Sequence, residues 1–130
     1  MKRIFLACCL LTAAVGITVQ PVPVYAAAPS APVTQAAFNT KINQMDSQIG
    51  AGNLSGAAST WDEINGMMMS VLGVTKDQLA AATTPAAKAT LETKHANQAM
   101  MYQTAWQLKQ DMTTNRVALK AKLNEFKATI

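Results

Sequence analysis

Cysteine and histidine are almost absent from this sequence of 130 residues. Its two cysteines, Cys8 and Cys9, lie next to each other near the N-terminus, and His95 is the single histidine. Because no cysteine follows residue 9, a domain formed by the rest of the chain cannot rely on disulfide bonds. Such a domain must be held together by the burial of apolar side chains.

Long apolar runs are confined to the N-terminus. Lys2 and Arg3 precede 16 uncharged and mostly apolar residues, 4–19, and two prolines follow. Val24 and Ala26 then place small residues at the −3 and −1 positions of a cleavage site. This order of charge, apolar run and small residues is that of a bacterial-type secretory signal peptide. We therefore expect residues 1–26 to be removed and the protein to be exported, to the periplasm or to the medium.

Two other interpretations of the N-terminus fit its residues less well. A membrane-spanning helix needs about 20 apolar residues, whereas this run is shorter and ends in prolines. A lipoprotein signal places its modified cysteine after the apolar run, whereas only four apolar residues precede Cys8. Cleavage after Ala28 fits the small-residue rule nearly as well as cleavage after Ala26. In either case we expect no membrane span in the mature chain.

Charge is sparse and nearly balanced. The chain has 11 basic and 7 acidic residues, a net charge of +4. Removal of Lys2 and Arg3 with the signal peptide would leave 9 basic and 7 acidic residues, a net charge of +2. The remaining basic residues are scattered, with a mild excess near the C-terminus, and form no dense patch. We therefore expect no nucleic-acid partner.

Residues 34–130 show the spacing of amphipathic helices, whereas residues 27–33, rich in alanine, proline and serine, are expected to form a flexible tether. In the first helix, apolar residues recur at intervals of four, three and four, which defines one face of an α-helix. These residues are Phe38, Ile42, Met45 and Ile49. Thr34 is suited to cap the N-terminus of this helix, and residues 50–53 are suited to end it.

A second helix is expected over residues 54–72, with Gly73 as its C-terminal stop. Its apolar face comprises Leu54, Ala57 or Ala58, Trp61, Ile64, Met68 and Val71. Thr75 and Gln78 then have the residue types and the spacing of a capping box. This motif predicts a further short helix that begins at Thr75.

From Thr84, an N-cap residue followed by proline, the pattern is helical almost to the C-terminus. Its apolar face includes Leu91, His95, Ala99, Met101, Tyr102, Ala105, Trp106, Leu108 and Met112, and continues through Leu119, Leu123, Phe126 and Ile130. We expect a break or kink near Thr114, because compactness and the typical length of helices favour one, although threonine and asparagine do not forbid a continuous helix. The alternative is one unbroken helix of about 43 residues, roughly 65 Å long, whose C-terminal half would need a second copy of the chain as a partner.

These patterns contain no strand. They predict an all-α protein, an up-down helical bundle of three to four main helices preceded by a cleavable signal peptide. Helices joined by short turns pack as antiparallel neighbours. A mature chain of about 100 residues is long enough for one core but not for two domains.

Methionine is unusually frequent in the expected mature chain. Seven of the eight methionines follow the signal peptide, and thioethers are ligands that favour Cu(I). The candidate metal ligands are His95, Met100 and Met101, but they lack the i, i+3 or i+4 spacing that brings donors together on a helix. We interpret the methionines as packing residues of the core. A Cu(I)-binding or carrier protein that uses methionines and His95 is the alternative hypothesis.

The sequence shows no constellation of catalytic residues. Glu92 and His95 form a single Glu-x-x-His pair, whereas a di-iron bundle needs two such pairs and two more glutamates. No serine, histidine and acid are placed for nucleophilic catalysis. We therefore predict no enzyme activity and no cofactor. The sequence favours a binding, interaction or structural module, which acts on an unknown protein partner or by self-association, for example as a homodimer.

Overall fold

The structure is a computed structural model that describes residues 31–130. The expected signal peptide, its cleavage site at Ala26 and most of the tether 27–33 lie outside the described residues. Residues from Pro32 to Ile130 form one unit. Its four α-helices are α3 (Gln35–Gly50), α4 (Leu54–Ala81), α5 (Pro85–Lys109) and α6 (Arg116–Lys127). The described residues contain no strand, which confirms the prediction of an all-α protein.

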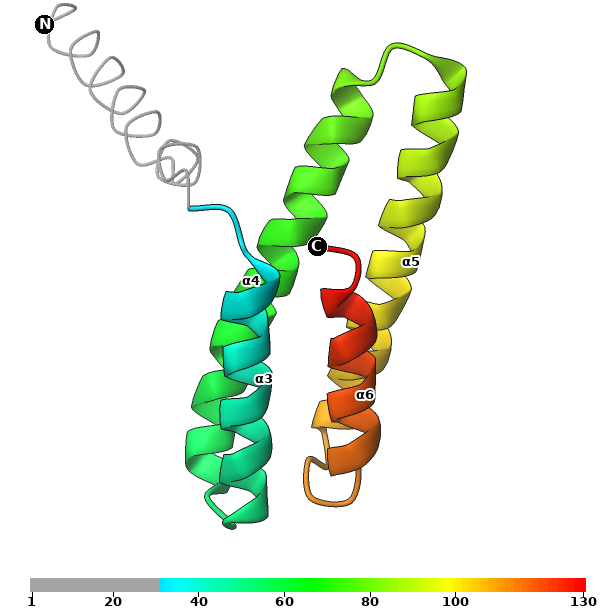
Figure 1. Cartoon of the computed structure of the whole chain (residues 1–130). Helices are drawn as coiled ribbons and strands as arrows, with labels where there is room; N and C mark the ends of the chain where they lie inside the picture. The colour runs from blue at the N-terminus through cyan, green and yellow to red at the C-terminus, as the bar shows by residue number, and fades with distance from the viewer. Residues whose placement is uncertain (1–30) are drawn as a thin grey trace, which may run out of the picture. The chain divides into compact units, whose positions relative to one another are not determined.

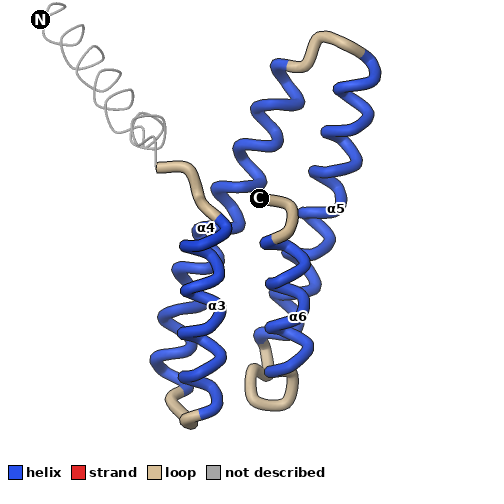
Figure 2. The backbone as a smooth tube through the Cα atoms, viewed as in Figure 1, coloured by secondary structure: helices blue, strands red, loops and turns tan. Residues whose placement is uncertain are grey.

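The four helices form a bundle in which each helix packs against two neighbours. α3 contacts α4, α4 contacts α5, α5 contacts α6, and α6 returns to contact α3. Consecutive helices run in opposite directions (Figure 1), and short loops join them (Figure 2). The prediction of an up-down helical bundle is therefore confirmed for the part of the chain that the structure describes.

The core lies where all four helices are side by side. Its fully buried side chains are Phe38, Ile42, Met45, Ala57, Trp61, Ile64, Met68, Ala105, Leu119, Leu123 and Phe126. The rings of Phe38 and Phe126 are stacked with their centroids 5.7 Å apart, which joins α3 to α6. The apolar faces expected for the first helix and for the last part of the chain therefore meet each other.

The expected ends of two helices are confirmed at their N-caps. The Thr34 hydroxyl accepts a hydrogen bond from the Ala37 amide at 3.1 Å, and the Thr84 hydroxyl accepts one from the Ala87 amide at 3.2 Å. Each satisfies an amide that has no partner within the helix. Between α3 and α4, Gly52 has a φ of 74°, a conformation that glycine adopts without strain.

Helix α4 is longer than the sequence pattern predicts. The expected stop at Gly73 and the separate helix from Thr75 are both wrong, because α4 runs for 28 residues without a break. A glycine inside a helix costs only about 1 kcal/mol relative to alanine. Val71 and Thr75, on either side of Gly73, are buried against the bundle, and this packing holds the helix together. The Thr75 hydroxyl donates to the Val71 carbonyl oxygen at 3.2 Å, and so it caps no helix.

The expected break near Thr114 is present. Residues 110–115 form a turn between α5 and α6. An Asp111 carboxylate oxygen accepts from the Thr114 amide at 3.1 Å, and the Asn115 side chain donates to the Leu108 carbonyl oxygen at 3.1 Å. The chain reverses here and α6 packs along α3, so the alternative of one unbroken helix is wrong.

Two residues expected on the apolar faces are exposed. Leu54, the first residue of α4, is 49% exposed, and Trp106 is 43% exposed. Ala105 occupies the buried position on α5, and its neighbour Trp106 therefore points about 100° away from it. The Trp106 ring lies under the Lys109 ammonium, 5.4 Å from the ring centroid.

The α4–α5 hairpin extends beyond the other two helices. α4 and α5 have 28 and 25 residues, whereas α3 and α6 have 16 and 12. The end of the hairpin consequently projects past α3 and α6 (Figure 1). None of residues 76–97 is fully buried. We call residues 76–97 the arm.

Candidate functional site

A cavity of about 190 Å³ lies where the arm leaves the bundle. Its apolar wall consists of Pro32, Val33, Val71, Val74 and Ile130. Two of these residues belong to α4, and the others belong to the segments that precede α3 and follow α6. Segments that are far apart in the sequence therefore build one apolar wall at the base of the arm.

The C-terminal side of this wall is held by hydrogen bonds. The Gln35 side chain donates to the Ile130 carbonyl oxygen at 3.2 Å, which ties the end of the chain to α3. Gln98 donates to the Thr129 hydroxyl at 3.0 Å, and this hydroxyl donates to the Phe126 carbonyl oxygen at 2.7 Å. These hydrogen bonds therefore fix the C-terminal part of the cavity wall to the rest of the fold.

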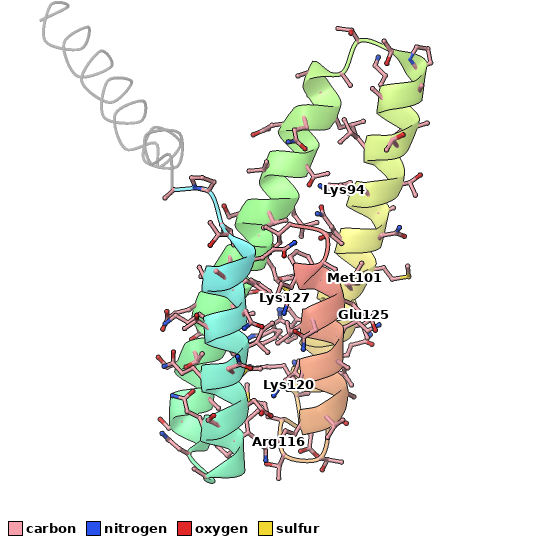
Figure 3. All side chains as sticks on the ribbon, viewed as in Figure 1. Lys94, Met101, Arg116, Lys120, Glu125 and Lys127 are labelled. Atoms are coloured by element: carbon pink, nitrogen blue, oxygen red, sulfur yellow. The ribbon has the colours of Figure 1, made fainter. Side chains whose placement is uncertain are left out.

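Five polar residues also line the cavity: Ser70, Thr75, Gln78, Lys94 and Thr129. The hydroxyl hydrogens of Thr75 and Thr129 are already bonded to backbone carbonyl oxygens. The side chains of Ser70, Gln78 and Lys94 form no hydrogen bond or ion pair with the described residues. Figure 3 shows Lys94 on α5 pointing toward α4, beside the end of the chain. Three donors at the cavity therefore have no protein partner in this part of the chain.

Gln98 holds the C-terminal part of the cavity wall in place through its hydrogen bond to Thr129. It is fully buried and lies one helical turn after Lys94 on α5. Its amide nitrogen bonds to Thr129, but its amide oxygen has no partner among the described residues. A buried acceptor without a partner costs about 1–3 kcal/mol, which the anchoring of the C-terminal segment must offset.

A carboxylate bonded by two cations lies between α3 and α6 and not at the cavity. Asp46 accepts from Arg116 Nε at 2.7 Å and from Lys120 Nζ at 2.8 Å. The hydrogen bond from Arg116, and then that from Lys120, lowers the pKa of Asp46 to about 2. The same contact with Asp46 raises the pKa of Arg116. None of these three residues lines the cavity, so we interpret this cluster as structural.

The candidate metal ligands His95, Met100 and Met101 all lie on α5. His95 and Met101 are half-buried, whereas Met100 is 60% exposed. The two methionines differ because consecutive helical residues point about 100° apart. No three side chains of histidine, cysteine, aspartate or glutamate within residues 31–130 are placed to hold a metal ion.

Sequence reasoning did not find the cavity, because its residues come from four separate segments and form no motif. The unequal length of the helices would have been a signal if the second helix had been expected to continue past Gly73. A hairpin longer than its two neighbouring helices must leave part of its inner face without a partner. The sequence pattern obscured this signal, since Gly73 suggested that α4 ends before the arm begins.

Comparison with known proteins finds no matching family model, no matching curated protein and no matching solved structure. Within residues 31–130, no helix has both the length and the apolar character needed to cross a bilayer.

Proposed function

We propose that this protein is exported and acts as a binding module, with the cavity at the base of the arm as its binding site. The observation that carries the proposal is the cavity itself, which combines an apolar wall with three side-chain donors that have no partner among the described residues. Concave, mostly apolar sites with a few placed polar groups are typical of ligand-binding sites.

The composition of the cavity supports binding rather than catalysis. None of its lining residues is histidine, cysteine, aspartate or glutamate. Ser70, Thr75 and Thr129 carry hydroxyl groups, and Lys94, the lining residue that could serve as a base, forms no hydrogen bond with any of them. The carboxylates with a lowered pKa, Asp46 and Asp111, are held by contacts elsewhere in the bundle. The residues at this site are thus suited to hold a molecule and not to activate one.

Export is supported by the three-part N-terminus, and N-terminal sequencing of the protein from the producing cells tests it. We expect the mature protein to begin at Ala27. Replacement of Ala26 by a large charged residue, Ala26→Arg, should block this cleavage, because the processing site accepts only small side chains. A mature protein that begins at Met1, or that carries a lipid on Cys8, contradicts the proposal.

The binding function is tested by nuclear magnetic resonance with a library of small fragments. We expect fragments to shift the methyl resonances of Val33, Val71 and Val74. The variant Val74→Phe should abolish these shifts, because Val74 is 50% exposed at the cavity and a phenylalanine there fills it. Val117→Phe is the matched control, since Val117 is 82% exposed on α6 and does not line the cavity.

Two results would contradict the binding function. In the first, fragments shift only resonances far from the cavity, for example those of α6. In the second, Val74→Phe binds the same fragments as the unaltered protein while its circular dichroism and melting temperature show that it is folded.

A further inference from the structure

We infer that the cavity binds a small monocarboxylate, with the apolar body of the ligand against the valines and its carboxylate at Lys94. This inference rests on the proposed binding function and specifies the chemical class of the ligand. It follows from three properties of the site: which of its hydrogen-bonding groups are unused, how its charge is balanced, and how large it is.

The unused polar groups of the cavity can all donate hydrogen bonds, and Lys94, unlike Ser70 and Gln78, cannot accept one. The hydroxyl hydrogens of Thr75 and Thr129 bond to backbone oxygens, as described above. Lys94 can only donate, and the Ser70 hydroxyl and the Gln78 amide can both donate. None of these three side chains is bonded to another described residue. A ligand group that only accepts, such as a carboxylate, matches this set better than a group that must donate.

Lys94 is the only lining residue of the cavity with a charged side chain. Lys41, Arg116, Lys120 and Lys122 each pair with a carboxylate. Lys94, like Lys76, Lys88, Lys109 and Lys127, has no carboxylate of the described residues within 4.0 Å of its ammonium group, and of these five lysines it alone lines the cavity.

No ion pair joins Lys94 to Ile130, although both residues line the cavity. The Ile130 carbonyl oxygen is directed to Gln35 on α3, from which it accepts a hydrogen bond at 3.2 Å. Lys94 is half-buried, and an anion beside a partly desolvated ammonium gains more than one beside an exposed lysine.

The volume of the cavity indicates how large an apolar group it can enclose. An apolar cavity of about 150 Å³ holds a benzene molecule, so a cavity of this size accommodates a body of about six to eight non-hydrogen atoms. Its wall is formed by the branched side chains of Val33, Val71, Val74 and Ile130, which favour an aliphatic or small aromatic body. Hexanoate, with about eight non-hydrogen atoms, is a suitable probe.

Titration of the exported protein with hexanoate, followed by amide and methyl chemical shifts, tests the inference. We expect saturable shifts at Val71, Val74 and Ile130 with a dissociation constant of about 0.1–1 mM, given the number of ligand atoms. Hexanamide has the same body without the charge, and acetate has the charge without the body. Both should bind at least about tenfold more weakly than hexanoate.

Two lysine variants separate the contribution of Lys94 from a general effect of charge. Lys94→Met retains the length of the side chain and should weaken hexanoate binding at least about tenfold, while hexanamide binding stays unchanged. Lys88→Met is the matched control, because Lys88 is exposed on the same helix and does not line the cavity. It should bind hexanoate like the unaltered protein.

The outcomes distinguish this inference from the proposed function. If hexanamide binds as tightly as hexanoate, or if Lys94→Met binds hexanoate normally, the carboxylate class is wrong but the cavity is still a binding site. If neither compound shifts the cavity resonances, the inference is overturned, and the comparison of Val74→Phe with Val117→Phe against the fragment library decides the binding function independently.

Discussion

Arg116 and Asp46 join the first and last helices of the bundle: the guanidinium Nε of Arg116 on α6 lies 2.7 Å from a carboxylate oxygen of Asp46 on α3. A Cβ atom on Gly50 would lie within 2.7 Å of the same guanidinium group, so glycine at this position gives Arg116 its place against α3. With the stacked rings of Phe38 and Phe126, this contact closes the ring of four helices. The closure leaves the longer hairpin free to form the arm and the cavity at its base.

Removal of the Asp46 charge should destabilise the protein at neutral pH. In Asp46→Asn, Arg116 and Lys120 lose their shared partner, and we expect the free energy of unfolding to fall by about 1 kcal/mol, since the partners are partly exposed and screened. Urea unfolding followed by circular dichroism measures the change. Asp62→Asn, on the exposed side of α4, should change the stability by less than about 0.5 kcal/mol. Equal effects of the two substitutions would show that the contact between α3 and α6 contributes nothing.

The same carboxylate predicts a pH dependence of stability. The pKa of Asp46 is about 2 in the folded protein, against an ordinary value of 3.8. The unfolded state therefore takes up a proton first as the pH falls, and the stabilisation by Asp46 is present above about pH 4 and lost towards pH 2. The difference in stability between the unaltered protein and Asp46→Asn should shrink over this range. A constant difference from pH 7 to pH 2 would contradict the assignment.

Shortening a buried side chain of α6 should lower the free energy of unfolding far more than shortening an exposed side chain of the same helix. Leu123 is fully buried between the helices, and Leu123→Ala should lower the free energy of unfolding by about 3 kcal/mol. Val117→Ala, at the most exposed apolar position of the same helix, should change it by less than about 0.5 kcal/mol. If Leu123→Ala were as mild as Val117→Ala in urea unfolding, α6 would not be part of the core.

The helices should unfold locally more often in the arm than in the bundle. The backbone of the arm belongs to the same two helices, but none of residues 76–97 is fully buried. Amide hydrogens of the arm should therefore exchange with solvent faster than those of the α4 and α5 segments within the bundle. Thr84→Ala, which removes an N-cap, should accelerate exchange further in the first turns of α5. Uniform protection along both helices would contradict the division into bundle and arm.

The methionines should not form a stoichiometric Cu(I) site if they act as packing residues. Met45 and Met68 are fully buried in the core, and Met100 is exposed on α5. Titration with Cu(I) against a competing chelator should give no uptake at one equivalent. Stoichiometric uptake that is lost in both His95→Ala and Met100→Leu, with the fold intact, would instead support the soft-metal alternative.

Local chemistry made much of the fold predictable. The N-caps Thr34 and Thr84, the turn at Gly52 and the break near Thr114 depend on neighbouring residues, and all four are where the sequence pattern places them. The apolar face of the first helix is likewise buried as expected. These features need no knowledge of distant segments.

The expectations that the structure contradicts concern positions whose conformation or burial depends on packing against distant segments of the chain. Gly73 is a plausible helix stop by itself, but burial of Val71 and Thr75 carries α4 through it. Trp106 resembles a core residue by type, but Ala105 occupies the buried position beside it. The cavity was not predicted for the same reason, because Val33, Val74 and Ile130 meet only after the chain has folded.

Intermolecular nuclear Overhauser effects with bound hexanoate test most directly whether the protein binds a ligand in the cavity at the base of the arm. We predict effects between the aliphatic protons of hexanoate and the methyl groups of Val33, Val74 and Ile130, which line the cavity. Effects confined to residues outside it, such as Trp106 or Val117, would contradict binding in the cavity.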